Sequence, residues 1–190
     1  MRIVAGKFRG KNLAASDHLK SLRPTTDKNR EALFNILSSA KFIKEIGFQI
    51  VGSEVLDLCC GSGAVGFEAL SRGAGSVVFI DNNQGHLALT KKNSELLKVE
   101  KDVKIICADA KNLPQNEKLF NLIFIDPPYA AEYLAIMTNL LEKGWANKTS
   151  LIVVEFQSDA KPQDFASENF QLLDLRKYGK TSFAFFTVNF

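Results

Sequence analysis

VLDLCCGSGAVG, at residues 55–66, is the segment from which the arrangement of the rest of the chain follows. Its apolar first half predicts a strand covered on both faces, and its glycines predict a tight turn that leads directly into a helix. Gly61, Gly63 and Gly66 form the pattern G-x-G-x-x-G, and Asp81 follows about 20 residues later, as in dinucleotide-binding proteins. The glycine pattern alone therefore leaves the ligand open.

Asp57 favours one kind of ligand over another. It precedes Gly61 by four residues, at the end of the predicted strand, where a carboxylate would repel a pyrophosphate. S-adenosylmethionine carries a sulfonium and an ammonium group and no phosphate, so its charges match an acid at this place. The segment thus favours a methyltransferase over a dinucleotide enzyme. A turn without any ligand is the weakest interpretation, because three glycines and a buried acid would cost stability.

Length and composition indicate one main domain. The chain has 190 residues, of which 46% are hydrophobic, enough for one good core but not for two. It contains no apolar run of about 20 residues and no apolar leader at its start, so we expect a soluble, cytoplasmic protein. Cys59, Cys60 and Cys107 show no metal-ligand spacing, which predicts three small core residues and no metal site. His18 and His86 lie too far apart to suggest a catalytic pair.

Positive charge is concentrated near the start of the chain. Residues 1–44 have a net charge of +7 and residues 45–190 one of −4. We expect a basic N-terminal extension at 1–44, made of a hairpin and a helix, and a catalytic domain at 45–190. A basic arm on a slightly acidic body suits the phosphates of a nucleic acid, although solvated surface charges give the same balance. The candidate phosphate contacts are Arg2, Lys7, Arg9, Lys11 and Arg23.

Hydrophobic periodicity predicts alternating strands and helices. A short hairpin at residues 2–4 and 12–14 is followed by a helix at 28–38, with Asp27 as N-cap and with Lys28, Arg30 and Glu31 on its wetter side. Further helices are predicted at residues 64–72, 84–97 and 132–143, and strands at 76–80, 103–107, 119–125, 151–156, 171–175 and 183–188. This βαβ order predicts a doubly wound sheet with its ligand at the carboxyl ends of the strands, closed by a hairpin that need not be parallel.

The motif DPPY, at Asp126 to Tyr129, follows a strongly apolar strand. Pro127 and Pro128 stiffen the chain and donate no hydrogen bond, which leaves carbonyls and the Asp126 carboxylate free to accept. Two acceptors on the hydrogens of an exocyclic amine would draw its lone pair out of conjugation with the ring and make it nucleophilic. Tyr129 would stack on a base that has left its helix. A rigid turn without chemistry is the simpler alternative.

Five segments together resemble the RsmD-type 16S ribosomal RNA guanine-N2 methyltransferases, in order and over nearly the whole chain. They are RIVAGKFRGKNL, LRPTTDKNREALFNIL, LDLCCGSGAVGFEALSRGA, FIDPPY and KYGKT. The resemblance implies a class I methyltransferase fold, with a seven-stranded, mostly parallel sheet, a C-terminal antiparallel hairpin and a small N-terminal hairpin and helix. It implies transfer of a methyl group from S-adenosylmethionine to the N2 amine of one guanine in 16S ribosomal RNA, either naked or in an assembling subunit. Separately from the resemblance, we expect a monomer.

The resemblance also assigns roles to individual residues. Asp126, Pro127, Pro128 and Tyr129 would form the catalytic motif. The cofactor would be held at its methionine part by Asp57, Gly61, Ser62 and Gly63, at its ribose by Asp81 with Asn82, and at its adenine by Asp109 and Ala110. This chain departs from the family in having Asp81 where glutamate is common, and Cys59 and Cys60 where alanine or phenylalanine is common; both changes look compatible with the cofactor.

Other functions remain open from the sequence. A DNA adenine-N6 methyltransferase uses the same D-P-P-Y chemistry but normally carries a target-recognition insertion, for which 190 residues leave little room. A protein-glutamine enzyme would favour asparagine in place of Asp126, and a carbon-directed pyrimidine enzyme would need a cysteine nucleophile near the substrate. The non-enzymatic alternative is an RNA-binding module that has a methyltransferase fold but no activity. Calorimetry with the cofactor, set beside an RNA methylation assay, separates it from an enzyme.

Overall fold

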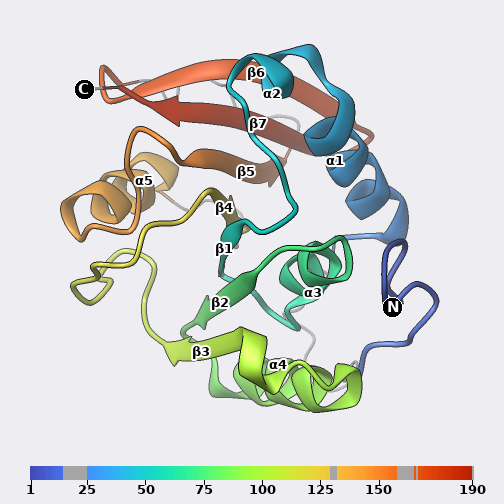
Figure 1. Cartoon of the computed structure of the whole chain (residues 1–190). Coiled ribbons are helices and arrows are strands. Elements are labelled where there is room, and N and C mark those ends of the chain that lie inside the picture. Colours follow the sequence, from blue (N-terminus) through green and yellow to red (C-terminus); the bar gives the residue numbers. More distant parts are fainter. Residues whose placement is uncertain (15–24, 129–131, 158–164, 166, 190) are drawn as a thin grey trace.

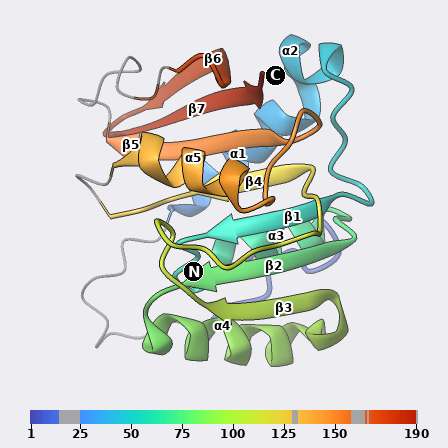
Figure 2. The ribbon, with the colours of Figure 1, turned by 90° about the vertical axis from the view of Figure 1, so that its left-hand side faces the viewer.

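A seven-stranded sheet runs through the middle of the protein (Figures 1 and 2). The computed structural model describes residues 1–14, 25–128, 132–157, 165 and 167–189. The strand order is β3-β2-β1-β4-β5-β7-β6, in which the first five strands are parallel and β7 is antiparallel to both β5 and β6. The strands are β1 (Glu54–Leu58), β2 (Ser76–Asp81), β3 (Val103–Cys107), β4 (Leu122–Ile125), β5 (Leu151–Gln157), β6 (Phe170–Tyr178) and β7 (Thr181–Val188).

Helices cover both faces of this sheet. They are α1 (Asp27–Ser39), α2 (Lys41–Glu45), α3 (Ala64–Ser71), α4 (Gln84–Leu97), the 3-10 helix η1 (Glu100–Asp102) and α5 (Tyr133–Glu142). In Figure 1, α1 and α3 lie on one side of the sheet and α5 lies on the other. The predicted fold class is thereby confirmed: a mostly parallel sheet of seven strands that ends in an antiparallel hairpin.

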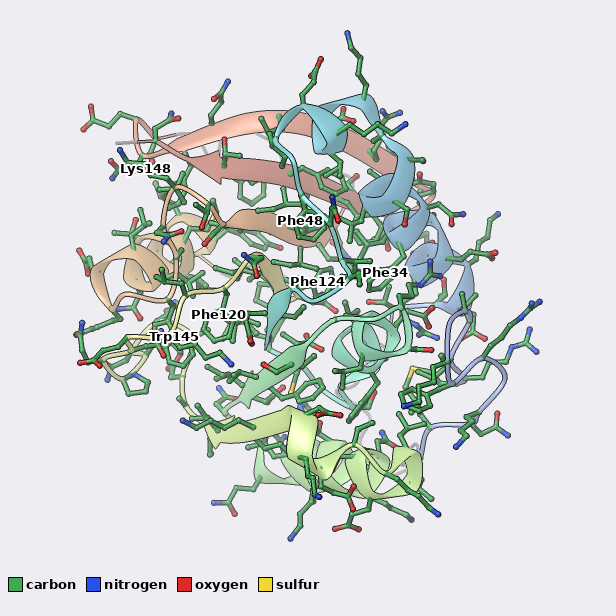
Figure 3. All side chains as sticks on the ribbon, viewed as in Figure 1. Phe34, Phe48, Phe120, Phe124, Trp145 and Lys148 are labelled. Atoms are coloured by element: carbon green, nitrogen blue, oxygen red, sulfur yellow. The ribbon has the colours of Figure 1, made fainter. Side chains whose placement is uncertain are left out.

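Successive side chains of the strands point to opposite faces of the sheet and belong to two hydrophobic clusters, one on each face. On the α1 side, Val55 and Phe124 pack with Phe34 of α1, and we call this group the α1-side cluster. On the opposite face, the α5-side cluster joins strand residues to α5 and to Phe120 and Trp145, whose rings stack with centroids 5.6 Å apart. Figure 3 shows Phe34 and Phe120 on opposite sides of the sheet. Burial on both faces explains why the central strands read as continuous apolar runs.

Most predicted elements agree with the structure to within a few residues at each end, and the strand predicted at 119–125 is the main exception. It begins only at Leu122, and the side chain of Leu119 is exposed. The last hairpin is longer than predicted, because β6 continues to Tyr178 and contains an irregularity between Leu172 and Asp174. The connector predicted at 41–53 to have some helical character contains α2 at its start.

Two details predicted for α1 are wrong. Thr26 is the N-cap, and its side chain accepts a hydrogen bond from the Asn29 amide, whereas Asp27 is the first residue of the helix. Arg30 was predicted on the wetter side, but its side chain is fully buried. Its guanidinium donates to the carbonyl oxygens of Arg2 and Thr25 and to the Asp27 carboxylate. These oxygens compensate the buried charge, which apolar packing alone could not do.

The N-terminal segment is held on the C-terminal half of α3. Glu68, fully buried, accepts hydrogen bonds from the Val4 and Ala5 amides at 2.8 and 3.0 Å. Gly6 has φ +80°, and a Cβ there would lie 1.9 Å from the Ser71 carbonyl oxygen, so only glycine fits this close approach. The predicted strands at 2–4 and 12–14 shorten to a single antiparallel bridge between Arg2 and Asn12. The turn that presents the basic residues is thus anchored mainly by α3.

The cysteines differ in their surroundings. Cys60 is buried, Cys59 is half-buried, and Cys107, at the end of the edge strand β3, is exposed, so the prediction of three core residues is wrong for Cys107. Among the residues that the structure describes, no helix is both long enough and apolar enough to span a membrane.

Candidate active site

The carboxyl ends of the parallel strands bring most of the predicted site residues to one edge of the sheet. Figure 2 shows the arrows of β1 and β2 pointing toward this edge. Asp57 lies one residue before the end of β1, Asp81 ends β2, and Asp126 directly follows β4. Each of them alternates with residues of the α5-side cluster, so all three side chains belong to the α1 face. Residues distant in sequence are thereby placed on one edge and one face.

The glycine loop after β1 is fixed by hydrogen bonds from three elements. The Gly61 amide donates to Asp81 Oδ2 and the Gly66 amide to Asp57 Oδ2, both at 2.9 Å. From α4, the Thr90 hydroxyl donates to the Gly61 carbonyl oxygen and the Asn93 amide to the Ser62 carbonyl oxygen. The loop is consequently a rigid and largely buried turn.

The glycines of the loop are needed for geometry. Gly61 and Gly63 have φ of +56° and +77°, and Cys59 also has a positive φ of +62°. A Cβ on Gly66 would lie 2.3 Å from the Phe79 ring, so only glycine at this position lets α3 pack this close to β2. The predicted strand, turn and helix are therefore present as expected from the sequence.

Asp81 joins β2 to the segment that follows it. Its Oδ1 accepts a hydrogen bond from the Asn83 amide at 2.9 Å and lies 3.2 Å from Nδ1 of His86, while its Oδ2 accepts from Gly61. Asn82 is exposed beside it. The carboxylate therefore orients both the glycine loop and the start of α4, and it is the local partner of the His86 ring.

The adenine-side candidates follow β3. Asp109 is exposed, and its carboxylate accepts a hydrogen bond from the Lys111 amide at 2.9 Å. Ala110 is buried in the α5-side cluster. Both lie at the same sheet edge as Asp81, since Asp81 pairs with Cys107 and the Ala108 amide donates to the Asp81 carbonyl oxygen.

Cys59 shows that the four acids gather at one place. Burial raises the pKa of its thiol, and the charges of Asp81, Asp126, Asp57 and Asp109 raise it further. These carboxylates come from the ends of β1, β2, β3 and β4, so a single thiol lies within the electrostatic field of all of them. Nothing in the sequence indicates this central position of Cys59, which reads as an ordinary core residue.

Asp126 continues the sheet beyond β4, with its amide donating to the Leu58 carbonyl oxygen at 3.2 Å. It is half-buried, Pro127 is buried and Pro128 is exposed. Tyr129 lies outside the described residues. A further acid, Glu155 of β5, follows the pair of Ile125 and Val154 and is buried beside this motif. Sequence reasoning missed Glu155, although a lone acid inside the apolar strand LIVVEF is a signal that could have revealed it.

The buried acids on this edge raise one another's pKa values. Burial, with the charges of Asp81 and Glu155, raises the pKa of Asp57 from 3.8 to about 7. Burial and the charges of Glu155 and Asp57 raise the pKa of Asp126 well above its usual value. Burial likewise raises the pKa of Glu155 to about 7, against the hydrogen bond from Thr25 and the positive charge of Arg30. A cationic ligand would relieve this repulsion, so the residues present fit a sulfonium or an ammonium group.

These shifts predict that the protein loses stability as the pH rises. The folded state holds the Asp57 proton up to about pH 7, whereas an unfolded chain releases it near 3.8, so folding takes up a proton between these values. We expect the free energy of unfolding to fall between about pH 4 and 7, and Asp57→Asn to reduce this fall by about 2 to 4 kcal/mol. Urea unfolding at several pH values measures it. Asp102→Asn, an exposed change on η1, is the control, and equal slopes in both variants would contradict the assignment.

The basic residues near the N-terminus have different environments. Lys7, Arg9 and Lys11 are exposed on the turn, with the Lys7 and Lys11 ammonium groups 5.3 and 5.6 Å from the centroid of the Phe8 ring. Arg2 is exposed as well, but its guanidinium lies 3.4 Å from the Asp27 carboxylate. Arg23 lies outside the described residues. The turn therefore gathers three of the five predicted phosphate contacts.

Comparisons with known proteins agree with the sequence and the geometry. A family described as Conserved hypothetical protein 95 matches residues 1–187. "Ribosomal RNA small subunit methyltransferase D" of Haemophilus influenzae is 35% identical over 96% of this chain and 91% of the relative. The protein of the same name from Escherichia coli K12 is 37% identical over 82% of this chain and 74% of the relative.

A solved structure has the same fold over the whole length of the chain. It is described as "Putative methyltransferase yhhF from Escherichia coli" and superposes with a TM-score of 0.80 at 30% identity, covering 100% of this chain and 98% of the other. The strand order and the edge with the glycine loop are thus those of a methyltransferase fold.

Proposed function

The chain belongs to the Conserved hypothetical protein 95 family, the RsmD family, and from this we propose that it methylates the N2 amine of a guanine in small-subunit ribosomal RNA with S-adenosylmethionine as donor. The relatives carry names of small-subunit ribosomal RNA methyltransferases, which supports the class of substrate. The observation that carries the proposal for this chain is the gathering of Asp57, Asp81, Asp109 and Asp126, the first residue of the DPPY motif, around Cys59.

The acidic edge suits the proposed cofactor. Bound there, S-adenosylmethionine would supply an activated methyl group on a positively charged sulfur. Asp57 and the glycine loop would lie by its methionine part, Asp81 with Asn82 by the ribose, and Asp109 with Ala110 by the adenine. The mutual repulsion of Asp57, Asp126 and Glu155 supports this placement, because a cation would lower the energy of three crowded carboxylates.

Asp126 and the Pro127 carbonyl are the proposed acceptors for the substrate amine. Among the described residues, no hydrogen bond occupies the Asp126 carboxylate, so its oxygens remain available. Two acceptors on the amine hydrogens localise the nitrogen lone pair, an interaction that grows in the transition state. Tyr129 would hold the base by stacking, for which its ring matters more than its hydroxyl.

Guanine N2 is the finer part of the proposal, and nucleoside analysis tests it. Purified protein, labelled S-adenosylmethionine and unmodified small-subunit RNA should give labelled N2-methylguanosine. Label in N6-methyladenosine, with DNA as the better substrate, would instead support the adenine-N6 alternative. Cofactor binding without any transfer would support an RNA-binding module on a methyltransferase fold.

We further propose a cytoplasmic monomer, with residues 1–44 as its RNA-binding extension.

The basic turn gives the proposal a second test. We expect Lys7→Gln/Lys11→Gln to weaken RNA binding and to make the slope of log K against log salt shallower by about 1.4 to 1.8, since each lost phosphate contact removes about 0.7 to 0.9. Lys41→Gln/Lys44→Gln removes the same charge from α2, which follows the far end of α1, and should leave the slope unchanged. Filter binding at several salt concentrations measures both. Equal slopes for the two double variants would mean that the turn is only solvated surface.

A further inference from the structure

Glu155 lies beside the proposed catalytic carboxyl although it is not part of the DPPY motif. In the parallel pair of β4 and β5, Ile125 lies opposite Val154, and the next residues on the two strands are Asp126 and Glu155. Ile125 and Val154 both face the α5-side cluster, so the residues that follow them share the opposite face. Two carboxyl groups are therefore neighbours at the edge of the sheet.

The Thr25 hydroxyl holds the Glu155 carboxyl in place. It donates to Glu155 Oε2 at 2.7 Å, and the bond is buried, with 6% of Thr25 and 8% of Glu155 exposed. A buried hydrogen bond between residues 130 positions apart fixes one segment against the other. This hydrogen bond therefore connects the residue before the N-cap of α1 to β5.

Arg30 connects Thr25 to the N-terminal segment by hydrogen bonds. The fully buried Arg30 guanidinium donates to the Thr25 carbonyl oxygen at 2.7 Å and to the Arg2 carbonyl oxygen at 2.6 Å. A continuous path of hydrogen bonds therefore leads from Arg2, through Arg30 and Thr25, to Glu155. It connects the segment that carries the basic turn with the edge that carries Asp126.

We propose that Thr25 and Glu155 are positioning residues that align the RNA-binding N-terminal segment with the Asp126 carboxyl, an inference that rests on the proposed function of that site. With the Thr25 hydroxyl in place, Glu155 Oε2 is occupied and the carboxyl is held toward α1. Without it, the start of α1 is no longer tied to β5, so the N-terminal segment and the RNA that it binds are no longer aligned with the Asp126 carboxyl. The link thus acts on the rate of transfer more than on binding.

Thr25→Val tests the link, because it exchanges the hydroxyl for a methyl group of similar size, while Thr25→Ser retains the hydroxyl. With small-subunit RNA and S-adenosylmethionine both saturating, we expect the single-turnover rate constant of Thr25→Val to fall about tenfold and that of Thr25→Ser to stay within about twofold of the unmodified protein. Calorimetry and filter binding should give cofactor and RNA Kd values within about twofold for both variants. A purely structural role would not separate rate from binding in this way.

Variants at Glu155 complete a double-mutant cycle. Glu155→Gln keeps an oxygen that can accept from Thr25 and should lose less activity than Glu155→Leu. Glu155→Leu removes the acceptor and should lose about tenfold, like Thr25→Val. The combination of Thr25→Val with Glu155→Leu should cost little more than either change alone, since both remove one shared interaction. All rates are measured below the thermal transition of each variant, so that only folded protein is compared.

The outcomes distinguish the positioning role of Thr25 and Glu155 from the proposed methyltransferase activity on which it rests. An active unmodified protein with an equally active Thr25→Val would overturn the link and leave the proposed function intact. Equal losses in Thr25→Val and Thr25→Ser, or fully additive losses in the double variant, would overturn it too. No methyl transfer by the unmodified protein would overturn the proposed function and this inference with it. A tenfold loss in Thr25→Val, rescued by serine, supports both.

Discussion

Asp126→Ala is expected to lower the single-turnover rate of methyl transfer by about 100-fold or more while leaving cofactor affinity unchanged. The change removes one of the two acceptors proposed for the amine, and that interaction strengthens only as the nitrogen attacks. Asp126 lies at the end of β4, and its backbone amide, not its carboxylate, makes the contact with Leu58, so the loop should keep its place. Single-turnover kinetics and cofactor calorimetry on the same preparation measure the two effects separately.

Asp126→Asn is the matched control for this prediction. An asparagine side chain keeps one oxygen acceptor and has nearly the same shape, so its loss should be clearly smaller than that of Asp126→Ala. A near-normal rate in Asp126→Ala would contradict the proposed chemistry even though the fold is that of a methyltransferase. A large loss of cofactor affinity would instead mean that the carboxyl belongs to the cofactor site.

Asp81→Ala is expected to weaken S-adenosylmethionine by about 30- to 150-fold, or about 2 to 3 kcal/mol. The Asp81 carboxylate accepts from the Gly61 and Asn83 amides, and it is the proposed partner of the cofactor ribose. Its removal leaves the buried Gly61 amide without its acceptor and loosens the glycine loop in addition to deleting the ribose contact. Calorimetric titration with S-adenosylmethionine measures the change.

Asp81→Glu separates these contributions. Glutamate keeps the charge and is common at this place in the family that the sequence resembles, so we expect it to retain cofactor binding within about tenfold of the unmodified protein. Unchanged affinity in Asp81→Ala would contradict the assignment of the β2 end to the cofactor.

The sheet and its edge could be predicted because their signals are local. The parallel strands β1, β2, β4 and β5 are buried on both faces and read as apolar runs. Asp57, Asp81 and Asp126 were found for this reason: each is an acid at the end of such a run. That they share one face also follows from counting along the strands.

What the sequence did not reveal depends on contacts between distant segments. Arg30 reads as a surface residue, since one of the carbonyl oxygens that compensate its charge belongs to Arg2, which lies 28 residues away in the sequence. Glu155 stands in an apolar strand, and only the pairing of β4 with β5 shows that it neighbours Asp126. Cys107 was assigned to the core because nothing in its own segment shows that β3 is an edge strand.

The most direct test of the proposed activity is nucleoside mapping of its product. Small-subunit ribosomal RNA from cells that lack this protein is incubated with the purified protein and S-adenosylmethionine, then digested and analysed by mass spectrometry. We predict one new N2-methylguanosine per RNA molecule, absent from a parallel reaction with the Asp126→Ala variant. A new methyl group on any other nucleoside, or none in RNA and in assembling subunits alike, would contradict the proposal.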